Sequence, residues 1–269
     1  MIDDATPVAT ATGVEEYTRY REDYLRDGFV VVRDFFTGEG FDELAGELDR
    51  YVAEVVPTLP DSDAFFQDRK SPETLKQMQH MIDPFFVEYG TREPFVSLAE
   101  ALMGEPVRAQ KPEWFNKPPG TDHPTPPHQD NFYINLDPPP LTRWLAMDPV
   151  DAENGCLRYC TGTHREGLRP HARTQVLGFS QGISDWNKED ESREVQVFLE
   201  PGDLAVHHGE LIHRADPNRS ETSDRRAFAI VFQAQSCQRD EDAFQRYMQN
   251  VNQQHQSLGL QIAADQDAL

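Results

Sequence analysis

The sequence has little cysteine, few basic residues and no long apolar run. Its three cysteines in 269 residues form no C-x-x-C pair, so we expect neither a disulfide framework nor a structural zinc site. No run of about 18 apolar residues occurs, which argues against a membrane-spanning helix. Residues 1–5 carry neither the basic nor the apolar region of a secretory signal. Together these absences predict a cytoplasmic protein with no membrane partner.

The charge of the chain is strongly one-sided. There are 25 Lys and Arg against 47 Asp and Glu, which gives a formal net charge of −22. An electric field of that sign repels nucleic-acid phosphates and anionic membrane surfaces. We therefore expect a small-molecule substrate and no nucleic-acid partner, while the composition leaves the oligomeric state open.

What is present predicts mainly β structure with flanking helices. Hydrophobic residues make up 38% of the chain, enough to bury a core. Apolar positions at helical spacing predict helices over residues 14–26, 41–55, 73–81, 95–103 and 240–251. After Gly104, short aromatic and β-branched runs alternate with Pro, Gly, Asn and Asp, a pattern typical of a sandwich or barrel. The strands expected there cover residues 107–116, 131–135, 141–147, 156–160, 195–198, 203–207 and 227–234.

We expect these elements to form one domain over residues 13–252. Residues 1–12 are small and polar and are predicted to be disordered, and residues 253–269 form a polar tail. Between two of the expected strands, a polar insertion over residues 174–193 carries Trp186. Because an insertion can cover a pocket, Trp186 is a candidate lid residue and substrate contact.

The most informative motif is His128-Gln129-Asp130, with a second histidine, His213, far along the chain. Two imidazoles and one carboxylate are the set that holds non-haem Fe(II) on one face and leaves the other face open. On a strand, residues two apart point to the same side, so His128 and Asp130 can reach one metal while Gln129 points away. A histidine from a neighbouring strand would complete the site.

Two consecutive arginines, Arg225 and Arg226, open the last apolar strand. Alternation along a strand places one of them on the interior side. A buried guanidinium needs an anionic partner, and a carboxylate matches its geometry best. Beside a metal centre, such an arginine is a candidate for binding the distal carboxylate of 2-oxoglutarate.

The residues around these motifs form an ordered series over most of the chain, roughly Gly28 to Phe232. The series consists of Phe115–Gly120, Pro127–Asp130, Trp144–Met147, Glu153–Leu157, Gly162–His164, Pro201–Asp203 and His213. It resembles the phytanoyl-CoA dioxygenase family, whose members are Fe(II)- and 2-oxoglutarate-dependent oxygenases. The resemblance implies a double-stranded β-helix core, that is, a cupin-like jelly roll. It also implies that His128, Asp130 and His213 are the iron ligands and the catalytic set.

The resemblance further implies where the co-substrate binds. Arg225 stands at the family's position for the 2-oxoglutarate arginine, one residue further from the distal histidine than is usual. Trp144 matches an aromatic residue that lines the co-substrate site, and Lys76 resembles a co-substrate-binding lysine. Two positions depart from the family pattern: Ala215 replaces a common serine, and Glu113 stands where methionine is common.

The implied cofactors are Fe(II), 2-oxoglutarate and O₂, and the implied reaction is hydroxylation of a small organic metabolite with release of succinate and CO₂. Related halogenases carry Ala or Gly in place of the ligating carboxylate, so Asp130 favours hydroxylation over halogenation. Two alternatives remain. The same cofactors could support desaturation, cyclisation or epimerisation, or the chain could be a non-catalytic metal-binding jelly-roll sensor.

Candidate substrate contacts come from several places in the sequence. Asn131 and Tyr133 follow the metal motif on an expected strand, so at most one of them shares the face of the metal. His164 and Trp186 complete the candidates. Basic residues expected near the mouth of the barrel favour an anionic substrate: Lys111, Lys117, Arg143 and Arg158.

Overall fold

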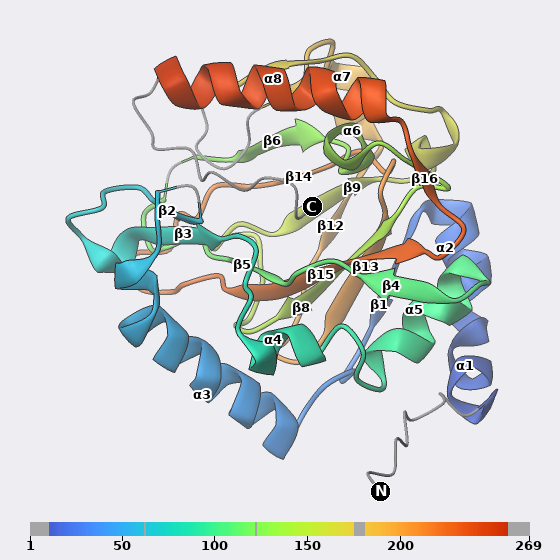
Figure 1. Ribbon diagram of the computed structural model, residues 1–269, viewed down its shortest axis with the longest axis horizontal. Helices are drawn as coiled ribbons and strands as arrows, with labels where there is room; N and C mark the ends of the chain where they lie inside the picture. The colour runs from blue at the N-terminus through green and yellow to red at the C-terminus, as the bar shows by residue number, and fades with distance from the viewer. Residues whose placement is uncertain (1–10, 62, 122, 175–180, 258–269) are drawn as a thin grey trace, which may run out of the picture.

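Two antiparallel sheets face each other in a jelly roll, which confirms the predicted fold class (Figure 1). The computed structural model describes residues 11–61, 63–121, 123–174 and 181–257. The larger sheet has the strand order β1-β13-β8-β15-β5-β3-β2, with β4 also paired to β15, and the smaller sheet has the order β12-β9-β14-β6. No helix in the described ranges combines the length and apolar character needed to cross a bilayer.

The strands of the larger sheet are β1 (Phe29–Val32), β2 (Ala64–Phe66), β3 (Leu75–Met78), β4 (Val107–Ala109), β5 (Glu113–Phe115), β8 (Leu141–Ala146), β13 (Leu204–His208) and β15 (Ala227–Ala234). Those of the smaller sheet are β6 (Thr125–His128), β9 (Leu157–Cys160), β12 (Glu194–Val197) and β14 (His213–Ala215). Two short pairs complete the strands, β7 (Leu136–Asp137) with β16 (Gln238–Arg239) and β10 (His171–Arg173) with β11 (Gln181–Ile183).

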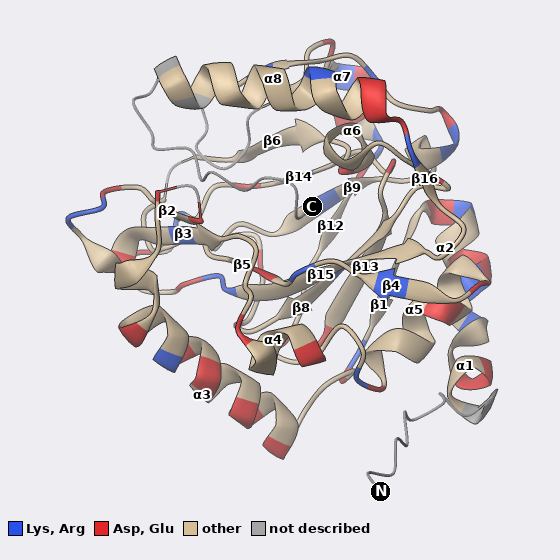
Figure 2. Cartoon of the chain, in the orientation of Figure 1, with Lys and Arg blue, Asp and Glu red and all other residues tan. Residues whose placement is uncertain are grey.

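The helices lie outside the two sheets (Figure 1). They are α1 (Ala11–Tyr17), α2 (Arg21–Asp27), α3 (Glu39–Glu54), α4 (Pro84–Glu88), α5 (Phe95–Met103), α6 (Asn131–Ile134), α7 (Lys188–Ser192) and α8 (Glu241–Ser257). The helices α3, α4 and α5 cover one face of the larger sheet, whereas α8 crosses the molecule at the opposite end, beside β6 and α6 (Figure 1). Acidic residues are spread along α3, in keeping with the net charge (Figure 2).

Alternation along the strands gives the larger sheet two different faces. On β15, Phe228, Ile230 and Phe232 pack in the main hydrophobic core, whereas Ala227 and Ala229 face the space between the two sheets. The helices contribute large side chains to the main core, among them Leu44, Tyr51, Phe86, Phe95 and Leu98. Each fully buried side chain of this size stabilises the fold by roughly 1.5–3 kcal/mol. The small alanines on the other face leave room for a cavity.

One glycine fixes the join between the N-terminal helices and the sheet. Gly28 ends α2 in the left-handed conformation, with φ 85°, and its N–H donates to the carbonyl of Tyr24 at 2.8 Å. A Cβ at this position would lie 2.5 Å from Nδ1 of His164, so both the conformation and the space require glycine.

Three predicted elements are wrong. Residues 73–81 form a 3₁₀ turn, Pro72–Thr74, followed by β3 instead of a helix, because pairing of β3 with β2 and β5 overrides local helix propensity. Residues 131–134 form α6, followed by Asn135 in the left-handed conformation, instead of a strand. The single strand expected over residues 107–116 is divided into β4 and β5 around Pro112, which cannot donate to a strand ladder.

Small parts of the two predicted tails are helical where they are described. Residues 11–12 belong to α1 and residues 253–257 belong to α8. The remaining parts of both predicted tails, residues 1–10 and 258–269, lie outside the described residues.

Candidate metal centre and active site

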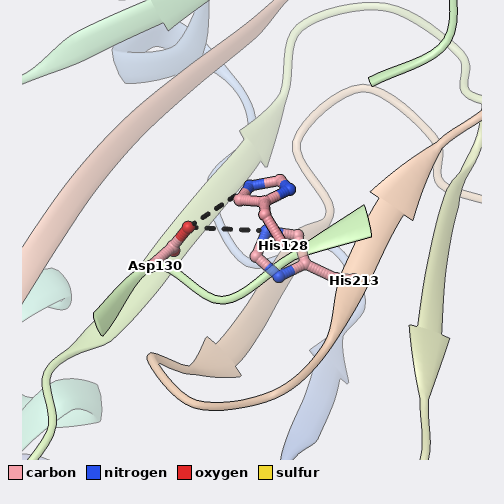
Figure 3. Close-up of side chains that lie close together, drawn as sticks. All are labelled: His128, Asp130 and His213. Carbon is pink, nitrogen blue, oxygen red and sulfur yellow. Dashed lines mark ion pairs between the residues drawn. The ribbon is translucent and has the colours of Figure 1, made fainter. Parts of the chain in front are cut away.

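The three predicted metal ligands come together at the end of the smaller sheet. The strands β6 and β14 are antiparallel, and His128 lies directly opposite His213 in their register. The two imidazole Nε2 atoms lie 3.5 and 3.6 Å from Oδ1 of Asp130 (Figure 3). One possible ligand atom from each residue lies within 4.8 Å of the other two, which is close enough to hold one ion.

The local backbone at this site differs from the expected strand. The strand β6 ends at His128, and Asp130 has helical dihedral angles, φ −59° and ψ −38°, as the residue that precedes α6. The tight turn, and not the alternation of a continuous strand, therefore brings the carboxylate back towards His128. The predicted set of residues converges, but the reason given for it is wrong.

Hydrogen bonds fix the orientation of both histidines. The Nδ1 atom of His128 donates to the carbonyl of Pro126 at 2.8 Å, and that of His213 donates to the carbonyl of Leu211 at 3.0 Å. In each ring this leaves the Nε2 lone pair directed at the shared site. Burial lowers the pKa of His213 well below its usual value, and the neighbouring His128 lowers it further. A neutral imidazole is the form that ligates a metal.

The carboxylate of Asp130 is held through its other oxygen. Its Oδ2 atom accepts from the Thr142 hydroxyl at 2.6 Å and from Nε2 of His207 at 3.0 Å. The Tyr159 hydroxyl lies 3.0 Å from Nδ1 of His207 and donates to it. Burial alone would raise the pKa of Asp130, but the neighbouring His213 and the hydrogen bonds from the surrounding side chains outweigh it and hold the pKa well below its usual value. Asp130 is therefore ionised, with Oδ1 directed at the two histidines.

His207 is the residue at this centre that the motif does not reveal. It lies on β13, which pairs with β8 in the larger sheet. In that pairing His207 lies opposite Thr142. The sequence feature that could have identified His207 is its position on a short strand just before the segment that carries His213. A histidine in that position is usually explained by packing or hydrogen bonding, and hydrogen bonding is its role here.

A cavity of about 250 Å³ adjoins the three residues and lies between the two sheets. Arg225 lines it, with an exposed fraction of only 4%. Its guanidinium carbon lies 5.1 Å from the ring centroid of Trp144, another lining residue. Its Nε has no hydrogen-bond partner in the described part of the chain. Burial lowers the pKa of Arg225 to about 10, so the side chain remains charged at neutral pH.

The neighbouring arginine has a different environment. Arg226 donates to Asp148 at 2.8 Å and to Asp49 at 3.1 Å, on the side away from the cavity. The alternation of β15 thus directs Arg225 inward and Arg226 outward. Of the two candidates, only Arg225 lines the cavity.

Two lysines extend the positive charge near Arg225. Lys76 lines the cavity from β3, and burial lowers its pKa. Lys117 also lines the cavity, and its Nζ donates to the carbonyl of His123 at 3.0 Å. Burial, followed by the charges of Arg225 and Lys76, lowers the pKa of Lys117 well below its usual range. This part of the cavity is suited to an anion.

Glu113 adds an acidic group to the cavity, in contrast to the two lysines. It lies on β5, paired with Ala229, which is in turn paired with Trp144 on β8. Burial and the nearby charge of Asp130 raise the pKa of Glu113 to about 7, although a hydrogen bond from Gln77 acts in the opposite direction. A carboxyl group with this pKa can donate or accept a hydrogen bond near neutral pH.

The predicted substrate contacts separate into two groups. Tyr133 lines the cavity. One helical turn of α6 places it on the same side as Asp130, which lies three residues earlier in the chain. The Asn131 amide instead donates to the carbonyl of Leu136. His164 has its Nε2 at 3.1 Å from the carbonyl of Leu25, and Trp186 packs against Ile183; neither lines the cavity.

Of the four basic residues expected near the mouth, only Lys117 lines the cavity. The guanidinium of Arg143 lies against Phe95 and Phe232 on the helix-covered face of the larger sheet. Arg158 pairs with Asp216 and Glu194, and Lys111 is outside the lining.

The C-terminal region supplies lining residues that the sequence gives no reason to select. Arg239 of β16 and Phe244 and Tyr247 of α8 face the same cavity as the metal site. The helix itself is predicted from its periodicity, but the pattern does not show what its apolar side covers.

Comparison with known proteins agrees with this geometry. Residues 24–227 match the family described as Phytanoyl-CoA dioxygenase (PhyH). The chain belongs to this family, which consists of iron- and 2-oxoglutarate-dependent oxygenases. The peroxisomal phytanoyl-CoA dioxygenase of Bos taurus is 27% identical over 235 residues, which cover 81% of this chain and 68% of that protein.

Solved structures show the same fold. EvdO2 from Micromonospora carbonacea var. aurantiaca, complexed with 2-oxoglutarate, has a TM-score of 0.65 at 24% identity, over 82% of this chain and 91% of that one. The epimerase SnoN, in complex with Fe3+, alpha ketoglutarate and nogalamycin RO, has a TM-score of 0.66 at 22% identity, over 85% of this chain and 86% of that one.

Proposed function

We propose that this member of the family is an Fe(II)- and 2-oxoglutarate-dependent dioxygenase that hydroxylates a small organic metabolite, with decarboxylation of 2-oxoglutarate to succinate and CO₂. The observation that carries the proposal is Arg225, a charged and buried guanidinium that faces the same cavity as the three metal-ligating side chains. A buried charge is costly without an anionic partner. The distal carboxylate of 2-oxoglutarate would supply that partner.

In this proposal His128, Asp130 and His213 hold the iron. Their donor set is the facial arrangement typical of non-haem Fe(II) oxygenases, which leaves open positions for a keto acid and O₂. Bound iron supplies the activation of O₂ that is coupled to oxidation of 2-oxoglutarate and of a substrate C–H bond. The protein contributes the fixed imidazole tautomers, the ionised carboxylate and the adjoining cavity.

The co-substrate would extend from the metal towards Arg225. A guanidinium can bind a carboxylate through two parallel hydrogen bonds, and the Trp144 ring holds Arg225 in place from one side. Lys76 is the remaining proposed co-substrate residue, since it lines the cavity with its charge close to Lys117. The anion-binding end of the cavity is thus assigned to 2-oxoglutarate.

The cavity also limits the substrate. Its volume of about 250 Å³ falls below the roughly 300–1,000 Å³ of most small-molecule pockets. It suits the co-substrate and the reacting part of a small metabolite better than a complete acyl-CoA. The three free cysteines support a reducing location such as the cytoplasm.

Two alternatives keep the same site. Desaturation, cyclisation or epimerisation would use the same cofactors, and the mass of the product separates them from hydroxylation, because hydroxylation adds an oxygen atom. A non-catalytic metal-binding sensor would bind iron without releasing succinate. The ligating carboxylate of Asp130 argues against halogenation, which requires an additional open position on the metal.

The test uses purified protein under anaerobic conditions. Addition of Fe(II) and 2-oxoglutarate should give the weak visible charge-transfer band of the chelated keto acid, and His213→Ala should abolish it. A metabolite panel is then screened in air for succinate release, which the His213→Ala variant should lower by at least about a thousand-fold. Arg226→Ala, whose side chain points away from the cavity, is the matched control and should keep the band. Folded wild-type protein with no band would refute the proposal.

A further inference from the structure

The cavity has one side that lies outside the segment shared with the family. The match ends at residue 227 and includes the metal ligands and Arg225. Arg239, Phe244 and Tyr247 come later in the chain and still line the cavity. Figure 1 shows α8 crossing the end of the molecule next to β6 and α6, which carry the metal motif. The cofactor-binding side and this side of the cavity therefore come from different segments of the chain.

The helix α8 is held in place at both ends. At its start, β16 pairs with β7, directly after α6, and the N–H of Asp240 donates to the carbonyl of Asn135 at 2.9 Å. Towards its end, the guanidinium of Arg173 on β10 donates to Gln253 at 2.7 Å. The Phe244 side chain is buried, with an exposed fraction of 7%. The helix is therefore an ordered wall of the cavity.

The side chains of this wall have a definite chemistry. The Tyr133 ring lies 5.8 Å from the His128 ring and 5.5 Å from the Tyr247 ring, so aromatic groups extend from a metal ligand to α8. The guanidinium carbon of Arg239 lies 4.3 Å from the centre of the Phe244 ring. An aromatic surface beside a cation fits a ring or apolar body that carries an anionic group.

We propose that α8 and the preceding β16 form a substrate subsite, in which Phe244 and Tyr247 pack on an aromatic or alicyclic ring and Arg239 binds its carboxylate. This inference rests on the proposed function, because it assigns the anion site at Arg225 to 2-oxoglutarate and leaves the α8 side to the substrate. The net charge of −22 repels anions at long range. A local cation is therefore needed to bind an anionic substrate.

The experiment uses 2-naphthoate as the probe and its neutral analogue 2-naphthol as the comparison. The protein is loaded anaerobically with Fe(II) and 2-oxoglutarate, and binding of each probe is measured by its fluorescence. Phe244→Ala should weaken binding of both probes by about ten-fold or more. Arg239→Gln should weaken 2-naphthoate by about ten-fold and change 2-naphthol by less than about two-fold. Arg246→Gln, an exposed arginine on the same helix, should change neither.

The charge-transfer band is recorded for every variant and reports on the folded co-substrate site. If Phe244→Ala loses the band, the milder variant Phe244→Leu is used in its place, because it keeps an apolar side chain at the same position. If the wild-type protein gives no band, the proposed function fails. If the band is present but the wild-type protein does not bind 2-naphthoate, or binds it no better than Arg239→Gln and Phe244→Ala do, the subsite is refuted while the proposed function stands.

Discussion

The two faces of the larger sheet each hold a buried arginine, and the two arginines lie in opposite environments. Arg143 points to the helix-covered face, where its guanidinium carbon lies 4.4 Å from the ring centroid of Phe95 and 4.1 Å from that of Phe232. Arg225 points to the face between the sheets, where Trp144 lies on one side and a cavity on the other. In the described part of the chain both have guanidinium nitrogens without a hydrogen-bond partner.

The comparison shows that an unpaired buried charge is not by itself a sign of a binding site. Burial lowers the pKa of Arg143 well below its usual value, and apolar rings occupy the space around it. The neighbours of Arg225 on β15 are alanines, which leave space for a ligand. What distinguishes Arg225, the arginine proposed to bind 2-oxoglutarate, is the volume beside it.

The largest expected effect tests this difference directly. Arg225→Ala should weaken 2-oxoglutarate binding by about a hundred-fold or more, because it removes the charged partner of a buried carboxylate. Iron binding should change little. Anaerobic titration of the charge-transfer band measures both.

The matched variant on the opposite face is Arg143→Met, which keeps an unbranched apolar stem and removes the guanidinium. It should leave 2-oxoglutarate binding within about two-fold, and the free energy of unfolding should be unchanged or higher by roughly 1 kcal/mol, because a buried charge is replaced by an apolar group. Equal weakening of 2-oxoglutarate binding by the two variants would contradict the distinction between the faces.

A smaller effect is expected from the groups that hold Asp130 on the cavity face. Thr142→Val removes the hydroxyl that donates to Oδ2 of Asp130, and iron affinity should fall by about 10- to 100-fold. Thr142→Ser keeps the donor and should restore most of the affinity. The measurement is an Fe(II) titration at saturating 2-oxoglutarate, and equal affinities for Val and Ser at this position would show that the hydrogen bond is unimportant.

The last effect is on stability and concerns Glu113 in the metal-free protein. Its pKa rises from 4.5 to about 7 on folding, so between these values the folded state binds more protons than the unfolded state. Stability that is present below about pH 4.5 is therefore lost as the pH rises through about 7. Glu113→Gln cannot ionise and should be more stable than the wild type by roughly 3 kcal/mol at about pH 8 and no more stable at about pH 4.5.

Urea unfolding at the two pH values measures this difference. Glu221→Gln, at an exposed position, is the control and should show no comparable change between them. A constant difference between Glu113→Gln and the wild type at both pH values would mean that Glu113 does not titrate on folding as described.

The metal centre could be predicted from the sequence because the types of residue alone indicate metal binding. Two imidazoles and a carboxylate at this spacing have few other uses, and they converge even though Asp130 lies in a turn and not on a strand. Alternation also predicted that one of Arg225 and Arg226 faces inward, while the choice of Arg225 came from the family resemblance. Residue type is sufficient for the metal ligands, whereas the arginine also needed the resemblance.

Other features depend on contacts between distant segments and could not be predicted in this way. Residues 75–78 favour a helix locally, but their pairing with β2 and β5 makes them a strand that brings Lys76 to the cavity. His207 and Phe244 reach the site because a neighbouring strand and the last helix happen to cover it. A periodic pattern shows that a face is apolar and does not show what lies opposite.

The hydrogen bonds from Nδ1 of His128 and His213 to carbonyls two residues earlier in the chain have a consequence for metal choice. Because each ring is oriented by its own segment, the two imidazoles are arranged before any ion arrives. Nitrogen and oxygen donors fixed in this way generally bind cobalt, nickel and copper more tightly than ferrous iron. Selection of iron then depends on the supply of ions in the cell and on the redox step that only iron completes. Competing ions would bind with the correct geometry and act as inhibitors.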